Sequence, residues 1–169
     1  GRYDAELAEH WNVVLGPNGG YLTAVVARAM TEEVADPARG LRSITVHYLR
    51  RPEFGPVAID VEVLRAGRSL SSVSATMHQD GAPICTALAA FSGPWDSPVA
   101  WARPMPEPAV DSRPDPGWAP PTHIGNFDTE LLVDAPLFSG RGSSRNAGWI
   151  RTVEPRPLDA IELVAISDA

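Results

Sequence analysis

The sequence contains no lysine, only one cysteine and no long hydrophobic run. The single cysteine, Cys85, excludes an internal disulfide and a cysteine-based metal cluster, and it fits a reducing cytoplasm, where we expect the protein to lie. No stretch approaches the roughly 18 apolar residues that a membrane-spanning helix needs. The first residues lack the charged start and apolar core of a signal peptide. Membrane association is therefore not expected.

Basic residues are scarce. All 14 of them are arginines, against 21 acidic residues, and the formal net charge is −7. Nucleic-acid binding usually needs a concentrated basic surface, and the sequence shows none, so a nucleic-acid partner is not expected. Arginine still suits local recognition of an anion, because its guanidinium group pairs bidentately with phosphate.

A helix is predicted over residues 21–34, after the turn cluster Gly16-Pro17-Asn18-Gly19-Gly20. The apolar residues of this stretch fall at i, i+3, i+4, i+7 and i+8, which is the spacing of one helix face. They are Leu22, Val25, Val26, Ala29 and Met30. Alanines widen the face, so the helix is expected to be buried on most sides.

Four strands are predicted to follow this helix. Apolar and polar residues alternate over 42–50 and 57–64, as in half-buried strands. Asp80-Gly81 predicts a hairpin between strands over 69–79 and 82–92, because both residue types tolerate positive φ. We therefore expect an α+β module over residues 1–95, in which an antiparallel meander buries one face against the helix. A sheet curled around one central helix is the hotdog fold, and a flat α+β sandwich is the alternative.

The stretch 96–126 has a different composition. Nine prolines between residues 93 and 126 exclude a helix or a central strand there. Three tryptophans, Trp95, Trp101 and Trp118, argue against a disordered tether, since disordered segments are poor in aromatics. We expect an extended linker strapped over the surface of the first module.

After the linker the sequence pattern begins again. The order aromatic, Asp, small, Glu, Leu in residues 3–7 recurs in residues 127–131. Irregular sequence and then a helix follow each copy, and the second helix is expected over about 158–168. Internal repetition indicates duplicated modules. Residues 127–169 are therefore predicted to start a second hotdog that is cut short, since a lone helix and strand cannot bury a core.

The chain resembles the double hotdog acyl-CoA thioesterases of type II. The segments that carry this resemblance are residues 16–22, 46–50, 60–69, 81–91 and 156–169. The resemblance implies hydrolysis of an acyl-CoA thioester to free acid and CoA, without a cofactor. In this family a carboxylate of the second hotdog activates water together with a Thr or Ser and a Gln. Asp168 falls at the position of that carboxylate, and its partners belong to the sheet expected to follow. Family members often have Gln after the glycine pair, where this chain has Tyr21.

Asp168 is also a catalytic candidate because of the residues around it, independently of the resemblance. The predicted second helix places Leu158, Ile161 and Ala165 on one stripe, and Asp168 continues it, with Asp159 and Glu162 on the other side. A carboxylate on an apolar stripe must be paired, hydrogen-bonded or protonated, because burying its charge is costly. Such a setting suits a general base. The alternative is a solvated aspartate at a frayed helix end.

Substrate-binding candidates lie at the start of the first helix. Asn18, Gly19, Gly20 and Tyr21 stand where free N–H groups and the positive end of the helix dipole would meet a thioester oxygen. An ordinary Asn cap with a flexible turn is the alternative.

Three further candidates lie on the predicted strands. His47 would line a cleft, although a satisfied polar histidine is the commoner case. Arg65 and Arg68 flank a tight turn and would meet the phosphates of CoA, with a solvated arginine pair as the alternative.

Other functions fit the sequence less well. No Gly-x-Ser-x-Gly motif supports a serine hydrolase, Cys85 is expected to be a core thiol, and the four histidines lack the spacing of metal ligands. The runner-up is a non-catalytic hotdog that binds an acyl group or CoA, or that assembles with partners. A hotdog dehydratase is weaker, because no histidine stands out beside an acidic residue. We expect acyl-CoA as the ligand and a homodimer or higher homo-oligomer, since exposed sheet edges commonly pair.

Overall fold

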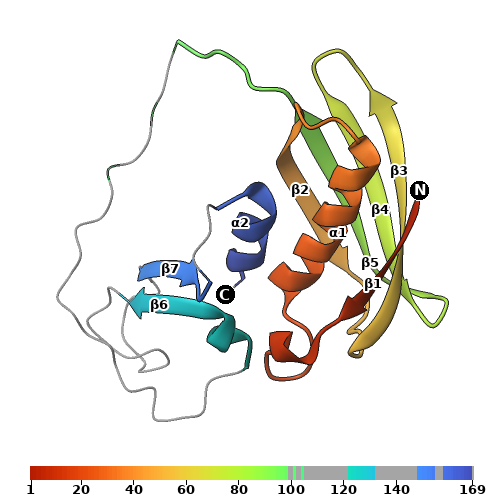
Figure 1. Cartoon of the computed structure of the whole chain (residues 1–169). Coiled ribbons are helices and arrows are strands. Elements are labelled where there is room, and N and C mark those ends of the chain that lie inside the picture. Colours follow the sequence, from red (N-terminus) through yellow and green to blue (C-terminus); the bar gives the residue numbers. More distant parts are fainter. Residues whose placement is uncertain (99–100, 102–103, 105–121, 132–147, 155–157, 169) are drawn as a thin grey trace.

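The structure, a computed structural model, describes residues 1–98, 101, 104, 122–131, 148–154 and 158–168. Five strands form one antiparallel sheet in the order β1-β3-β4-β5-β2. They are β1 (Arg2–Leu7), β2 (Gly40–Tyr48), β3 (Gly55–Ala66), β4 (Ser71–Gln79) and β5 (Ala82–Ser92). The helix α1 (Gly19–Val34) lies against one face of this sheet (Figure 1). This arrangement is the hotdog fold that the sequence predicted.

The strand order corrects the expected meander. Only β3, β4 and β5 follow one another in space, whereas β2 pairs with β5, with Tyr48 opposite Cys85. Between β2 and β3 the chain therefore crosses from one edge of the sheet to the strand beside the opposite edge. The other edge is β1, which was not predicted as a strand and which places Leu7 opposite Gly55 of β3. Alternation reveals which face of a strand is buried but not which strand lies beside it.

The hairpin between β4 and β5 is confirmed. Asp80 and Gly81 have φ values of 52° and 77°, so both turn residues adopt the left-handed conformation of a type I′ turn. In α1 the side chain of Asn18 accepts a hydrogen bond from the N–H of Tyr21 at 2.8 Å and caps the helix. The helix ends at Val34, because Ala35 is left-handed with φ 51° and Pro37 follows shortly after.

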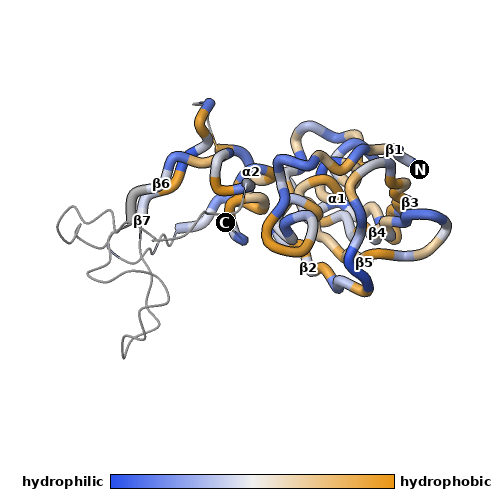
Figure 2. The backbone as a smooth tube through the Cα atoms, turned by 90° about the horizontal axis from the view of Figure 1, so that it is seen from below, coloured by the Kyte–Doolittle hydropathy of each residue, from blue (hydrophilic) through white to orange (hydrophobic). Residues whose placement is uncertain are grey.

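The hydrophobic core lies between α1 and the sheet. Leu22, Val26, Ala29 and Met30 of the predicted helix face are buried, and Cys85 is buried in the sheet as expected. The largest fully buried side chains come from both layers. They are Phe91, Leu7, Met30, Ile59, Met77 and Ile84. Figure 2 shows these hydrophobic stretches gathered where α1 meets the strands.

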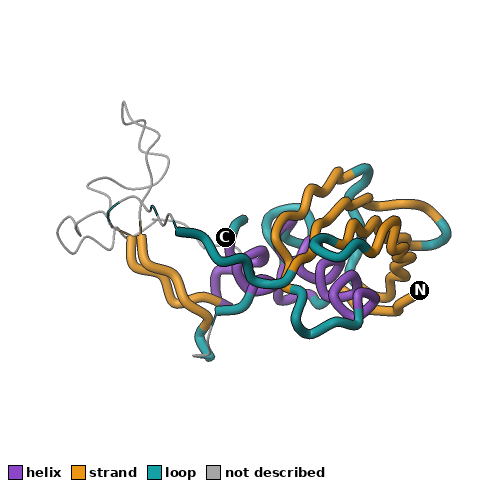
Figure 3. Tube along the Cα trace, turned by 90° about the horizontal axis from the view of Figure 1, so that it is seen from above, coloured by secondary structure: helices purple, strands orange, loops and turns teal. Residues whose placement is uncertain are grey.

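The second part of the chain, like the first, has a strand followed by a helix, although the elements between and before them differ. A 3-10 helix, η2 (Thr122–Asn126), leads into β6 (Phe127–Leu131), which corresponds in sequence to β1, and α2 (Ala160–Ile166) corresponds to α1. The additional strand β7 (Gly148–Thr152), which was not predicted, pairs with β6. Figure 3 shows this two-stranded ribbon extending away from the five-stranded sheet, while α2 packs against α1.

The predicted linker over 96–126 lies mostly outside the described residues. Trp95, just before the linker, and Trp101 within it are 71% and 80% exposed, so neither packs closely onto the first module, contrary to expectation. The exclusion of helix was wrong for Thr122–Asn126, because this short 3-10 helix follows the last proline of the stretch. It docks on the 3-10 helix η1 (Glu9–Trp11) through hydrogen bonds from His123 N–H and the Thr122 hydroxyl to Asn12 O, each 3.2 Å long.

Candidate active site

The two helices touch where Gly20 of α1 meets the last turns of α2. A Cβ atom added to Gly20 would lie 2.5 Å from the backbone oxygen of Ala165 and 3.0 Å from the Cβ of Asp168. Real Cβ atoms essentially never approach backbone so closely, so only glycine allows this contact. The glycine therefore brings the end of α2 to the beginning of α1.

Asp168 lies at this junction, just beyond the end of α2. Its Oδ2 accepts hydrogen bonds from the Gly20 N–H at 3.1 Å and from Asn18 Nδ2 at 3.3 Å. Its Oδ1 has no hydrogen-bond partner within the described part of the chain. A carboxylate at a helix N-terminus is stabilised by the N–H groups and by the helix dipole. The structure thus joins the predicted catalytic residue to the predicted binding residues of α1.

The expected burial of Asp168 is not found, since its side chain is exposed. The apolar stripe is buried only at Ala165, and Leu158 is 51% exposed. Instead Glu162, which was placed on the other side of the helix, is 3% exposed. The periodicity was extended too far, because α2 ends at Ile166 and Asp168 belongs to the turn that follows.

Asn18 holds Asp168 from the other side of the junction. Its side chain is 1% exposed, and its Nδ2 donates to the backbone oxygen of Asp168 at 2.6 Å as well as to Oδ2. Its Oδ1 accepts from the Tyr21 N–H, and its own N–H donates to Trp11 O at 2.9 Å. The Asn18 side chain therefore caps α1 through its oxygen and holds Asp168 through its nitrogen.

Within the described part of the chain, one backbone donor in the first turn of α1 has no partner. The N–H of Gly20 is engaged by Asp168 and that of Tyr21 by Asn18. The N–H of Gly19 has no hydrogen-bond partner among the residues that the structure describes, and it points from the positive end of the helix dipole. Gly19 is therefore the candidate that remains able to receive a substrate oxygen.

Tyr48 and Thr23 also belong to this junction, and neither was predicted from the sequence as a site residue. The Tyr48 hydroxyl donates to Gly19 O at 2.7 Å and lies 2.6 Å from the hydroxyl of Thr23. Burial raises the pKa of Tyr48, the hydrogen bond with Thr23 lowers it, and the negative charge of Asp168 raises it. The alternation of the strand could have indicated that Tyr48 faces α1, because it is in phase with the inward-facing Ile44 and Val46.

Three predicted candidates lie away from Asp168. His47 is exposed and alternates with the residues of β2 that face α1, so it lies on the outer face of the sheet. Arg65 and Arg68 are exposed at the turn between β3 and β4. Arg39, beyond the end of α1, donates to the backbone oxygen of Arg68 at 3.2 Å. This turn therefore lies at the opposite end of the helix from Asp168, roughly 24 Å away for 16 helical residues.

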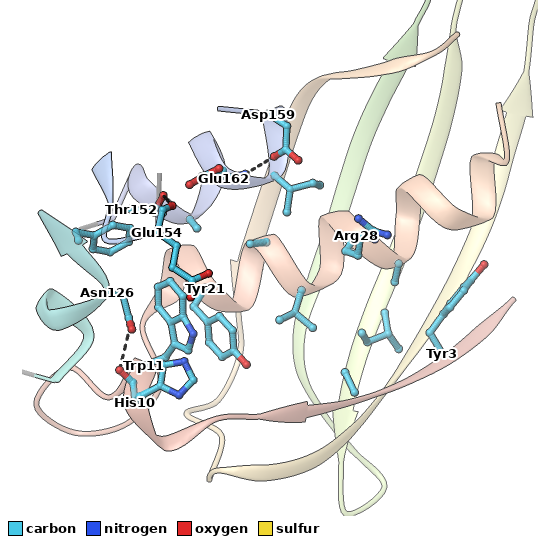
Figure 4. Close-up of a pocket in the computed structure, with 18 of the residues that line it drawn as sticks. Tyr3, His10, Trp11, Tyr21, Arg28, Asn126, Thr152, Glu154, Asp159 and Glu162 are labelled. Carbon is cyan, nitrogen blue, oxygen red and sulfur yellow. Dashed lines mark hydrogen bonds between the residues drawn. The ribbon is translucent and has the colours of Figure 1, made fainter. Parts of the chain in front are cut away.

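A groove of about 890 Å³ runs along α1 on the side of β1. Trp11 and Tyr21 stack in its wall with ring centres 4.7 Å apart, and Phe127 meets Trp11 edge-on at 5.7 Å. Figure 4 shows the aromatic pair beside the carboxylates of the lining. The acidic residues of that lining are Asp4, Glu32, Glu154, Asp159 and Glu162. Arg28 is paired with Glu32 at 2.9 Å, so the groove is unsuited to phosphate.

Tyr21, a predicted binding residue, holds the wall of this groove together. Its hydroxyl accepts from the Ala8 N–H at 3.2 Å and donates to Glu6 O at 3.3 Å. The side chain therefore links α1 to the end of β1. Among the described residues, no hydrogen bond joins it to Asp168.

No three His, Cys, Asp or Glu side chains of the described chain come together as a metal-binding group. Among the described helices, none is long and apolar enough to span a bilayer.

The fold and the junction define a hotdog protein with a carboxylate held at a helix N-terminus. The acyl-CoA thioesterase N-terminal domain family matches residues 7–92, about half of the chain. The chain therefore belongs to this family. No curated protein matches it.

Solved structures support the same fold. A hotdog protein of unknown function from Alicyclobacillus acidocaldarius is 24% identical, with a TM-score of 0.79 over 99% of this chain and 63% of that one. The acyl-CoA thioesterase II TesB2 from Mycobacterium marinum is 21% identical, with a TM-score of 0.66 over 99% and 62%. A Bacillus halodurans protein solved with CoA is 15% identical, with a TM-score of 0.50 over 54% and 65%. The chain spans less than two thirds of each of these proteins.

Proposed function

We propose that the protein hydrolyses acyl-CoA thioesters to the free carboxylic acid and CoA. The observation that carries the proposal is the carboxylate of Asp168, whose Oδ2 is held by Gly20 and Asn18 while Oδ1 has no partner within the described chain. A carboxylate fixed through one oxygen presents the other in a defined direction, as a general base requires. The family to which residues 7–92 belong is named for this activity.

In the proposed reaction Oδ1 of Asp168 accepts a proton from a water molecule. The water oxygen then attacks the thioester carbon and forms a C–O bond, and the carbonyl oxygen becomes negatively charged. The N–H of Gly19 lies at the positive end of α1, where it would donate to that oxygen. When the intermediate collapses the C–S bond breaks, and the proton held by Asp168 passes to the sulfur of CoA. The products are a carboxylic acid and a free thiol.

The location of the CoA moiety follows from charge. Its phosphates would be repelled by the acidic lining of the groove beside β1. Arg65 and Arg68 remain the predicted phosphate ligands. A CoA bound by them would have to extend along α1 from these arginines to place its thioester at Asp168. The similar B. halodurans protein was solved with CoA, which supports a ligand of this kind for this chain.

Release of free thiol from acyl-CoAs tests the proposal. The protein is offered a series of acyl-CoAs from short to long chains, and liberated CoA is measured with a thiol reagent. We expect release above the spontaneous rate, with one range of chain lengths preferred. A folded protein that binds acyl-CoA but releases no thiol would replace the enzyme with the runner-up, an acyl-binding or CoA-binding hotdog. A folded protein that neither binds acyl-CoA nor releases thiol would leave only a hotdog that assembles with partners.

A further inference from the structure

Tyr48 connects the edge of the sheet to the first turn of α1. It is the last residue of β2, and its ring is about half exposed while its hydroxyl reaches inward to Gly19 O at 2.7 Å. The hydroxyl of Thr23, one turn along the helix and 8% exposed, lies 2.9 Å from the same carbonyl and 2.6 Å from the Tyr48 hydroxyl, to which it donates once the Tyr48 proton is on Gly19 O. Two hydroxyl groups thus lie within hydrogen-bonding distance of one backbone oxygen.

The carbonyl of Gly19 and the N–H of Gly20 belong to the same peptide group. Its carbonyl accepts from Tyr48, whose hydroxyl is in turn hydrogen-bonded to Thr23, and its N–H donates to Asp168 Oδ2 at 3.1 Å. Hydrogen bonds in a chain polarise one another and strengthen each bond by about 10–30%. A donor on the carbonyl therefore strengthens the hydrogen bond that the N–H makes to the carboxylate.

The packing leaves no room for a side chain at position 19. A Cβ atom added to Gly19 would lie 2.9 Å from Asp168 Oδ2 and 3.1 Å from the Tyr48 hydroxyl. The pKa of Tyr48 is raised above its ordinary value of 10.0, chiefly by burial. The phenol therefore keeps its proton at neutral pH and remains a donor.

On the basis of the proposed hydrolysis, we infer that Tyr48 is a positioning residue that acts on Asp168 through the Gly19–Gly20 peptide. Its hydroxyl, with that of Thr23, tightens the hold of the Gly20 N–H on Oδ2 and so keeps Oδ1 aimed at the attacking water. Tyr48 itself does not touch the reacting atoms in this arrangement.

The Gly20 amide proton reports this relay without any substrate. In NMR spectra of the protein we expect Tyr48→Phe and Thr23→Val each to move that proton upfield, and the double variant to move it further. In thiol-release assays each single variant should lower kcat about two- to fivefold with KM unchanged, as expected when one hydrogen bond to a charged group weakens. The unfolding midpoint should stay near that of the parent.

Thr31→Val is the matched control, because Thr31 makes the same kind of hydroxyl bond, to Ala27 O at 2.8 Å, further along α1. It should leave both the Gly20 proton and kcat unchanged. A Gly20 proton that does not move in Tyr48→Phe or in Thr23→Val overturns the inference, whatever happens to activity. A parent without thioesterase activity would instead defeat the proposed function, and the Gly20 proton would still decide whether the relay exists.

Discussion

The side-chain amide of Asn18 donates to both the backbone oxygen and Oδ2 of Asp168, across 150 positions of the chain. One residue thus caps the central helix of the first hotdog and fastens the end of the helix that follows the linker. The proposed chemistry depends on this link, because the base comes from one repeat and the helix N-terminus from the other. Neither repeat holds the whole arrangement by itself.

Replacing Asn18 with Ala should be costly. The change removes a helix cap, worth about 1 kcal/mol. It also leaves the part-buried N–H of Tyr21 without its acceptor and the backbone oxygen of Asp168 without the Asn18 donor. We expect a loss of about 2–3 kcal/mol in the free energy of unfolding, measured with urea. Asn126→Ala is the control, because its amide joins the same parts of the chain through a single bond to His10 O. Equal losses in the two variants would contradict the role given to Asn18.

Gly20→Ala should force the helices apart. The new Cβ would meet the backbone of Ala165, which cannot rotate away as a side chain can. Overpacking of this kind costs about 1–3 kcal/mol, and thiol release should fall as Asp168 moves from the helix start. Gly40→Ala is the control, since a Cβ there meets nothing within 4 Å. If Gly20→Ala were as stable and as active as Gly40→Ala, the close crossing of α1 and α2 would not exist.

Cys85 should make stability depend on pH in the alkaline range. Burial raises the pKa of its thiol to about 11, against 9.0 for a free group, although a backbone hydrogen bond at Met77 lowers it. The unfolded chain therefore loses the proton first. The free energy of unfolding is unaffected by this group below about pH 9 and falls between pH 9 and about 11, by up to roughly 1.4 kcal/mol per pH unit.

The Cys85→Ala variant isolates this effect. Its unfolding free energy should decline less steeply than that of the parent from pH 9 upward, when both are measured with urea at each pH. The parent thiol should also react slowly with a thiol reagent until the protein unfolds. Parallel pH curves, or rapid labelling of the native protein, would show that the thiol is not shielded.

The sequence indicated the hotdog because its signals are local. The alternation of the strands, the helical spacing of residues 22–30 and the Asp80-Gly81 turn all act within a few residues. The neighbours of β2 and the role of β1 were missed, because pairing depends on where the chain crosses the sheet. The division of the chain at 95 and 126, the oligomeric state and the cytoplasmic location stay predictions.

The candidate site was only partly visible in the sequence. Asp168 and Asn18 were chosen separately, and no pattern indicated that they touch, since contacts between repeats arise from packing. Tyr48 was read as a strand residue, and its hydroxyl contact with α1 depends on the turn at the end of β2. His47, Arg65 and Arg68 were chosen for their chemistry, and their position relative to Asp168 could not be known before the strands were ordered.

Thiol release by Asp168→Asn, beside the parent and Asp159→Asn, is the most direct measurement of the proposed chemistry. Asparagine keeps an oxygen for the Gly20 N–H but cannot accept the proton of water. Asp159 caps the same helix, and asparagine serves as a cap equally well. We predict at least a tenfold fall in kcat/KM for Asp168→Asn, about 1.4 kcal/mol of transition-state stabilisation, and almost none for Asp159→Asn. Undiminished release by a folded Asp168→Asn protein would contradict the assignment of Asp168 as the base.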